Sequence, residues 1–265
     1  MPGSLHRPAR VTERIVENAK TISLVLDVSM RAAPGQFAML WIPGVDEKPF
    51  SISGEDPLQF TVARVGPFSD VLHALVVGDT LWVRGPFGRG YTAGNGRTLL
   101  AGGGYGAAPL HFLGRSILST GAAGIEAALG ARSSADLLFV ERFQALGAEV
   151  HLATEDGSAG TRGRVTDVVA PLLESGRFAR LCACGPEGML ESLAALCRAA
   201  GVPAELSYEA YMRCGIGMCG ACEHGGRLIC MDGPVVSVAA PNGGAESAGC
   251  GSMTAAPNPP STAAP

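Results

Sequence analysis

The chain has 265 residues, which is enough for two domains of ordinary size and a small appendage. Apolar residues make up 47% of it, so packed cores are expected, and the net charge of −4 shows none of the basic excess typical of nucleic-acid binding. No apolar run reaches the roughly 18 residues of a membrane span, and the start lacks the apolar core of a signal peptide, so we expect a cytoplasmic protein without a membrane partner.

Residues 1–95 are predicted to form an antiparallel β-barrel. Short runs rich in β-forming residues are separated by turns that contain Gly and Pro. Several strands at this spacing favour a small barrel. The predicted strands cover residues 21–26, 36–42, 58–63 and 80–84, with one helical stretch at 69–76.

Two groups in this part are suited to hold a flavin nucleotide. The first combines a cation, an aromatic ring and a hydroxyl, which match a phosphate, the flavin ring and a hydrogen bond near its reactive nitrogen. The second offers a helix start to a phosphate. Each group taken alone is also what an ordinary strand edge or a capped turn contains. The residues are Lys48, Pro49, Phe50 and Ser51 in the first group, and Gly66, Pro67, Phe68 and Ser69 in the second.

Residues 96–200 are predicted to form a Rossmann-like α/β domain with a parallel sheet. Short apolar strands alternate with helical segments, which is the pattern of βαβ units. The strands are expected at 98–101, 125–130, 149–153 and 181–184, and the helices at 109–118, near 135–147 and near 163–175.

A glycine-rich turn between a predicted strand and helix matches G-x-G-x-x-A, the pattern of dinucleotide-binding turns. Its residues are Gly102, Gly103, Gly104, Gly106 and Ala107. The helix start that follows offers free N–H groups to a phosphate. A tight structural turn is the alternative reading of the same residues.

The other nucleotide-binding candidates are Cys184, Gly185 and Pro186, which follow a strand at the sheet edge where ligands bind. A plain loop is the alternative. The second strand ends near Arg132 without the usual acidic ribose ligand, which leaves NAD and NADP both open. Asp136 and Glu155 are further groups within possible reach of a ribose.

The most specific motif is a cysteine run near the C-terminus, predicted as a segment over residues 201–238. Cys214, Cys219 and Cys222 have the spacing C-x4-C-x2-C, and Cys230 follows downstream. This is the plant-type pattern for a [2Fe–2S] cluster. The glycines between the cysteines let the backbone wrap a cluster closely.

Other uses of these cysteines fit less well. Structural zinc sites usually show two short cysteine pairs, whereas Cys230 stands alone. Disulfides are unexpected in a long chain with bunched cysteines. His224 offers half of a Rieske site, but the required second pair does not follow. Residues 239–265, rich in Ala, Pro and Gly and including Cys250, are predicted to be a disordered tail.

As a set, these motifs resemble the ferredoxin–NADP reductase superfamily, and more closely the electron-transfer subunits of NAD-dependent dihydroorotate dehydrogenase. The resemblance covers about residues 10–236. It is carried by Lys48–Ser51, Gly85–Gly88, Gly102–Gly106 with Pro109, Cys184–Pro186, Ser207–Cys222 and Cys230–Val235.

The resemblance implies a flavin iron–sulfur oxidoreductase subunit that is linked to NAD. FAD would stack on Phe50 with Ser51 near its reactive edge, and its phosphates would lie near Gly66–Ser69. The nicotinamide nucleotide would lie at Gly102–Ala107 and Cys184–Pro186. Lys48 stands where related flavoproteins commonly have Arg, and a lysine lacks the bidentate fork of arginine.

The implied reaction follows from counting electrons. Nicotinamide takes a hydride, a cluster passes single electrons, and FAD handles both, so FAD would lie between them. The resemblance implies an FMN-containing dihydroorotate dehydrogenase catalytic subunit as partner, in a heterotetramer with two of each subunit. The chain shows no substrate-oxidising residues of its own, which fits a subunit role in pyrimidine biosynthesis.

Two rival interpretations stay open at this point. One is an FAD and [2Fe–2S] reductase subunit of a hydrogenase-type or ferredoxin:NADP oxidoreductase complex, because such subunits share these motifs. The other is a zinc-stabilised binding protein that retains the reductase scaffold.

Overall fold

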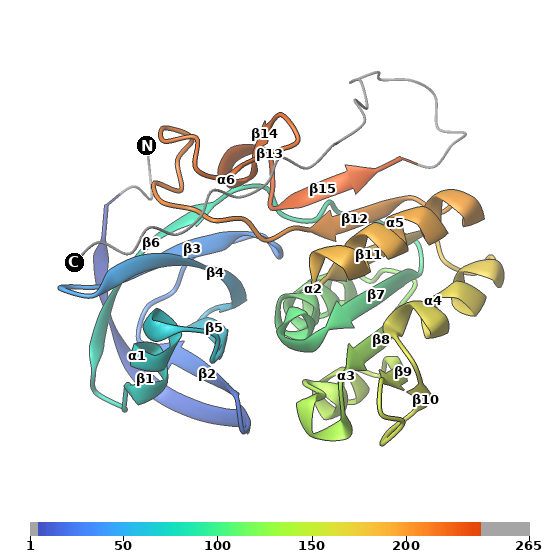
Figure 1. The fold of residues 1–265 in the computed structure, drawn as a ribbon, viewed down its shortest axis with the longest axis horizontal. Coiled ribbons are helices and arrows are strands. Elements are labelled where there is room, and N and C mark those ends of the chain that lie inside the picture. Colours follow the sequence, from blue (N-terminus) through green and yellow to red (C-terminus); the bar gives the residue numbers. More distant parts are fainter. Residues whose placement is uncertain (1–4, 240–265) are drawn as a thin grey trace, which may run out of the picture.

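The computed structural model describes residues 5–239, so Cys250 and the rest of the predicted tail from residue 240 lie outside the described residues. The first domain is a six-stranded closed barrel with antiparallel pairing, as predicted (Figure 1). The strand order around it is β1-β2-β5-β4-β3-β6. Its elements are β1 (Arg7–Asn18), β2 (Thr21–Leu26), β3 (Phe37–Ile42), β4 (Asp46–Glu55), β5 (Leu58–Ala63), α1 (Pro67–Ala74) and β6 (Thr80–Phe87).

The barrel core comes from side chains that alternate along the strands. In β5 the residues Leu58, Phe60 and Val62 are fully buried, while the residues between them are partly exposed. This period of two places one face of the strand inside the barrel. β2 and β5 have the bounds expected from the sequence, whereas β1 and β4 were not among the predicted strands.

The second domain is a mostly parallel sheet with helices on both faces. Its order is β10-β9-β8-β7-β11-β12-β15, and only β15 runs antiparallel to its neighbour. The strands are β7 (Thr98–Gly103), β8 (Ile125–Ala131), β9 (Glu149–Thr154), β10 (Thr161–Arg162), β11 (Arg180–Cys184), β12 (Ala204–Ser207) and β15 (Val235–Val238). The helices are η1 (Gly104–Gly106), α2 (Ala107–Ser119), η2 (Ser134–Asp136), α3 (Val140–Ala145), α4 (Val165–Glu174) and α5 (Glu187–Ala200).

Two hydrophobic cores lie on opposite faces of this sheet. One is built with side chains of α2 and α3, and the other with side chains of α4 and α5 (Figure 1). Cys197 lies in the second core and Cys182 in the first, and both are fully buried. The predicted helix near 135–147 is shorter than expected, because Phe139 has a left-handed backbone (φ 65°) just before α3.

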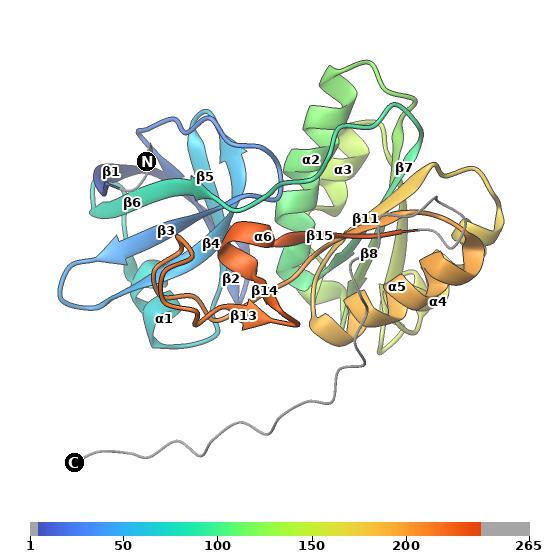
Figure 2. The ribbon, with the colours of Figure 1, turned by 90° about the horizontal axis from the view of Figure 1, so that it is seen from above.

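The cysteine segment leaves the sheet after β12, runs against the barrel and returns as β15 (Figure 2). It holds a small hairpin of β13 (Glu223–His224) and β14 (Arg227–Leu228), followed by the short helix α6 (Ile229–Asp232). Its buried side chains pack on Phe37 and Met39 of β3. The sheet therefore continues past the expected boundary at residue 200, and the cysteine segment is an excursion between two of its strands.

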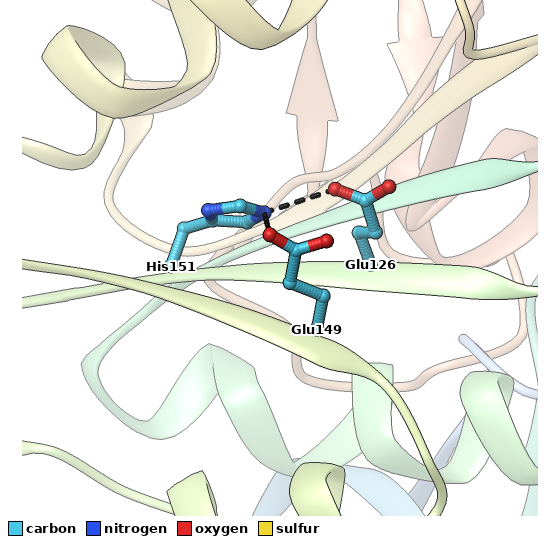
Figure 3. A group of neighbouring side chains, drawn as sticks. All are labelled: Glu126, Glu149 and His151. Carbon is cyan, nitrogen blue, oxygen red and sulfur yellow. Dashed lines mark hydrogen bonds and ion pairs between the residues drawn. The ribbon is translucent and has the colours of Figure 1, made fainter.

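A buried ion-pair network closes the amino end of the sheet, opposite the carboxyl ends of its parallel strands. Glu126, only 1% exposed, accepts hydrogen bonds from Arg97 (2.9 Å) and Arg177 (2.6 Å) and contacts the ring of His151 (2.9 Å). Glu149 lies 3.7 Å from the same ring (Figure 3). Because two guanidinium groups already engage Glu126, we assign the network a structural role. Among residues 5–239 there is no helix with the length and hydropathy to cross a bilayer.

Candidate functional site: two cavities and a cysteine loop

The first cavity, of about 470 Å³, lies where the barrel, the second domain and the cysteine segment meet. We call it the barrel cavity. Both candidate flavin groups of the sequence meet in its wall, although 14 residues separate Ser51 from Gly66 in the chain. From these groups the wall contains Lys48, Pro49, Phe50, Ser51, Gly66, Pro67, Phe68 and Ser69, and from the second domain it contains Gly106 and Cys184.

Aromatic rings and a capped helix shape the barrel side of this cavity. The rings of Phe50 and Phe68 lie 6.1 Å apart between centroids. At the start of α1 the hydroxyl of Ser69 accepts hydrogen bonds from the N–H groups of Val65 and Gly66, each at 2.9 Å. Ser69 therefore fixes the turn that leads into the helix.

Lys48 makes contacts that the sequence did not predict. Its ammonium group lies 2.7 Å from a carboxylate oxygen of Asp46 and 5.5 Å from the centre of the Tyr211 ring. The hydrogen bond with Lys48 lowers the pKa of Asp46, so this carboxylate stays charged near neutral pH. Lys48 thus joins the barrel to the cysteine segment at the cavity wall.

The cysteine segment and one tyrosine of the glycine-rich turn complete the barrel cavity. Sequence reasoning missed them, although the run of aromatic residues just before Cys214 was a possible signal. They are Tyr105, Tyr208, Glu209, Ala210, Tyr211 and Met212. The hydroxyl of Tyr105 donates a hydrogen bond to Glu209 at 3.3 Å.

A second cavity, of about 550 Å³, opens at the carboxyl ends of the parallel strands. We call it the sheet cavity. Gly103, Gly104 and Pro186 of the predicted nucleotide residues line it. This is the edge at which nucleotides bind to open α/β sheets.

Charged groups surround the sheet cavity. The cations are Lys20, Arg64, Arg132 and Arg164, and the acids are Asp136 and Glu155. Ser133 donates a hydrogen bond to Asp136 at 2.9 Å, which fixes the carboxylate. The acidic group that the end of β8 lacks is therefore supplied from η2 and from the end of β9, and the cations suit a phosphate-bearing ligand.

Of the other predicted nucleotide residues, Gly106 and Cys184 line the barrel cavity, whereas Gly102, Ala107 and Gly185 line neither cavity and act through packing. A Cβ on Gly102 would lie 3.2 Å from the Cα of Ala107, so this glycine lets α2 approach β7 closely. A Cβ on Gly185 would lie 2.5 Å from a side-chain carbon of Met189 and 3.1 Å from the backbone of Gly103. These contacts match the packing roles of small residues in dinucleotide-binding turns.

Three of the four cysteines of the motif lie on one loop, and Cys230 lies on α6 beyond the β13–β14 hairpin. Cys222 and Cys230 are buried, Cys214 is half-buried and Cys219 is exposed. Gly215, Gly217 and Gly220 all have left-handed backbones, with φ of 69°, 78° and 71°. Glycine adopts this conformation without the steric cost of a side chain.

Backbone N–H groups of the loop point at the cysteine sulfurs. The N–H groups of Met218 and Cys219 lie 3.3 and 3.4 Å from the Sγ of Cys214, and that of Gly217 lies 3.2 Å from the Sγ of Cys230. Burial opposes ionisation of Cys214, but hydrogen bonds from the N–H groups of Ile216, Cys219 and Met218 and from the Cys219 side chain outweigh it and lower its pKa to about 6.

Burial raises the pKa of Cys230 to about 12, with a further contribution from its neighbour Cys222. This thiol therefore needs a bound metal to ionise near neutral pH. Four thiols, three of them with N–H donors at their sulfurs, fit the donor set that a [2Fe–2S] cluster requires.

Comparisons with known proteins agree with this geometry. Residues 209–240 match the family model described as the iron-sulfur cluster binding domain of dihydroorotate dehydrogenase B. A solved chain of an NADH-dependent reduced ferredoxin-NADP oxidoreductase is similar, with a TM-score of 0.79 and 29% identity, over 86% of this chain and 87% of that one. The FAD/NAD-binding domain of a nitric oxide dioxygenase from Vibrio cholerae, at 22% identity and a TM-score of 0.65, shares the fold over 74% of this chain and 94% of that one.

Curated relatives match over most of their length. A protein of Methanocaldococcus jannaschii is 39% identical over 85% of this chain and 87% of its own, and one of Methanopyrus kandleri is 41% identical over 86% and 88%. Both are described as the probable electron transfer subunit of dihydroorotate dehydrogenase B (NAD(+)). The chain therefore belongs to the family of dihydroorotate dehydrogenase B (NAD(+)) electron transfer subunits.

Proposed function

We propose that this chain carries electrons from a dihydroorotate-oxidising partner subunit to NAD+, with a [2Fe–2S] cluster and FAD as its cofactors. One observation carries the proposal. Residues 207–212 line the barrel cavity, and the chain continues directly from them to Cys214. The same short segment therefore borders the proposed flavin site and begins the cluster loop.

We assign FAD to the barrel cavity. Phe50 would pack on the flavin ring, Ser51 would hydrogen-bond its polar edge, and the turn Gly66–Ser69 would bind phosphate. FAD supplies both hydride and single-electron chemistry, which is what links a nicotinamide to a cluster. The side chains of this cavity hold the cofactor and exclude water from it, and we assign no catalytic acid or base.

We assign NAD to the sheet cavity, which shares the residues Ala63, Val65 and Tyr105 with the barrel cavity. The two cavities therefore adjoin, as a hydride transfer between flavin and nicotinamide requires. Arg132 and Arg164 would bind phosphate, and Asp136 and Glu155 would bind ribose hydroxyls.

We assign the cluster to Cys214, Cys219, Cys222 and Cys230. We keep three of the domains proposed from the sequence: the flavin domain at 1–95, the nucleotide domain at 96–200 and the cluster segment at 201–238. The strands β12 and β15 tie the last two together in one sheet.

The partner is proposed to be an FMN-containing catalytic subunit, with two copies of each chain in the complex. The exposed Met218, 81% accessible, precedes the exposed Cys219 in the chain, and Met231, 47% accessible, lies against Gly217 of the same loop. Apolar groups of this kind suit a protein interface, and a partner bound there would bring its own cofactor near the cluster.

The test begins with the spectrum of the anaerobically purified protein, together with its flavin, iron and zinc content. We expect one FAD and two irons per chain with the visible bands of both groups. A protein with zinc and neither flavin nor iron would support the binding-protein alternative and overturn the proposal.

The second step identifies the partner. The chain is co-purified with its catalytic partner and assayed for dihydroorotate-dependent NAD+ reduction. The similarity to an NADH-dependent reduced ferredoxin-NADP oxidoreductase favours one alternative, a ferredoxin-linked reductase subunit. A complex that is active with reduced ferredoxin or hydrogen and inert with dihydroorotate would establish that alternative instead.

A further inference from the structure

A buried arginine anchors the start of the cysteine loop to the barrel. Arg84 in β6 is 6% exposed, and its Nη1 donates a hydrogen bond of 2.8 Å to the backbone carbonyl of Cys214. Its guanidinium also lies 5.3 Å from the centre of the Phe87 ring. Few buried cations occur without a specific partner, because removing a charge from water is costly.

The partner of Arg84 is Glu47 in β4. The two side chains form a bidentate pair, with 2.6 Å from Nε to Oε1 and 2.9 Å from Nη2 to Oε2. Burial raises the pKa of Glu47, but hydrogen bonds from Arg84 and His6 outweigh it and hold the pKa below its usual range. Glu47 is therefore charged near neutral pH, and the guanidinium of an arginine carries its charge throughout proteins.

The loop packs on the barrel at the same place. A Cβ on Gly215 would lie 3.3 Å from the Cγ of Met39 and 3.6 Å from a ring carbon of Phe87. Arg84 therefore contacts Cys214, the first proposed cluster ligand, and Glu47 contacts Arg84. Glu47 is also the residue before Lys48, which lines the barrel cavity. One ion pair connects the wall of the flavin site to the cluster loop.

We propose that Arg84 and Glu47 are positioning residues that also set the reduction potential of the cluster through their opposite charges. The proposal rests on the proposed function, because it requires a cluster at Cys214. Reduction adds one negative charge to the cluster, so the positive Arg84 favours the reduced form and the negative Glu47 disfavours it. Their balance would set how readily the cluster exchanges electrons with the flavin nearby.

A purely structural pair would behave differently. Loss of either residue would then loosen the cysteine loop in the same way. Any change in the reduction potential of the cluster would therefore have the same sign in both single variants. A pair that acts through charge shifts the potential in opposite directions when each member is neutralised. The sign of the two shifts separates these cases.

The experiment is a redox titration of the cofactor-loaded protein, with the reduced cluster followed by electron paramagnetic resonance. Arg84→Gln is expected to lower the potential and Glu47→Gln to raise it, each changing the equilibrium constant for reduction about three- to tenfold. At about 59 mV for a tenfold change in a one-electron couple, this is a shift of about 28 to 59 mV. The double variant is expected near the wild-type value, and Arg84→Lys should lie between wild type and Arg84→Gln.

The control is Glu17→Gln. Glu17 pairs with Arg142 at 2.7 Å, away from the cysteine segment at the α3 side of the molecule (Figure 1). Its neutralisation should leave the potential unchanged. Shifts of the same sign for Arg84→Gln and Glu47→Gln, or no shift in Glu47→Gln, would overturn this inference. A wild-type protein without the cluster signal would instead overturn the proposed function.

Discussion

The hydroxyl of Tyr105 donates a hydrogen bond of 3.3 Å to the carboxylate of Glu209, and so joins the glycine-rich turn to the segment that leads into the cluster loop. Tyr105 also lies in the wall of both cavities. Burial, with the nearby negative charge of Glu209, raises the pKa of Tyr105, so the phenol stays protonated and the bond persists through the physiological range. The side chain stands where the nicotinamide and the flavin would meet.

We therefore expect Tyr105→Ala to weaken NAD+ binding about tenfold while the flavin stays bound. The variant loses the apolar ring between the cavities. A tenfold increase in the dissociation constant corresponds to a loss of about 1.4 kcal/mol in the free energy of binding. Tyr105→Phe keeps the ring and is expected to change the dissociation constant less than about threefold. Titration of NAD+ into the oxidised, flavin-loaded protein measures both. Equal affinities of the wild type and Tyr105→Ala would show that the ring does not contact the dinucleotide.

Replacement of Cys230 by Ala is expected to abolish the cluster signal without loss of FAD. Cys230 is 1% exposed and packs under the loop, while the flavin residues lie in the barrel. Absorption spectra and iron content of the purified variant give the result. Cys197→Ala is the matched control, because Cys197 is equally buried but lies on α5 in the second domain. An unchanged cluster spectrum in Cys230→Ala would mean that another residue is the fourth ligand.

Gly217→Ala is expected to reduce cluster occupancy. It is also expected to lower the reduction potential of the remaining cluster, because a displaced loop weakens the hydrogen bond from this N–H to the Sγ of Cys230. Gly217 has φ of 78°, its N–H points at the Sγ of Cys230, and a Cβ there would lie 2.8 Å from the Cγ of Met231. The backbone conformation alone costs an L-residue about 1–2 kcal/mol. Gly44→Ala is the control, since Gly44 has φ of 79° in a barrel turn and, among residues 5–239, only its own chain neighbours lie within 4 Å of its Cβ position. Equal iron content in the two variants would contradict the expectation.

The sequence predicted the parts of this molecule that depend on local pattern. Runs of β-forming residues between turns predicted the bounds of β2 and β5, and the spacing of Cys214, Cys219 and Cys222 identified the cysteine loop. Short strands such as β12 and β15 were missed, because their pairing comes from a chain that leaves the sheet and returns about 30 residues later, which no local period reveals.

In the candidate site, too, some residues could be predicted from a local pattern and others could not. The two flavin groups carry recognisable residue types, and the structure brings them into one cavity. The residues Tyr208–Met212 belong to the signature of the cluster segment, but nothing in it indicates a flavin site, and they line that cavity because the segment crosses from the sheet to the barrel. Arg84 gives no local signal either, since its partners Glu47 and Cys214 lie 37 and 130 residues away.

His111 is expected to make the stability of the protein depend on pH. It lies on α2 with its ring 5.4 Å from Phe143 and 5.5 Å from Phe139, measured between centroids. Burial lowers its pKa from 6.5 to about 4, assisted by the positive charges of Arg142 and Arg115. Between these two values the unfolded chain binds more protons than the folded one, so stability is complete above about pH 6.5 and falls as the pH decreases towards 4.

We expect the half-buried His111 to account for a loss of about 1–2 kcal/mol in the free energy of unfolding between pH 7 and pH 5, after allowance for solvent screening. His111→Phe keeps an aromatic ring against Phe139 and Phe143 but cannot be protonated. The variant should therefore lose less stability than the wild type over this interval, while acid effects common to both proteins cancel in the comparison. Urea unfolding of each protein at both pH values, followed by circular dichroism, measures the difference. Parallel losses in the two proteins would show that His111 is protonated as readily in the folded state as in the unfolded chain.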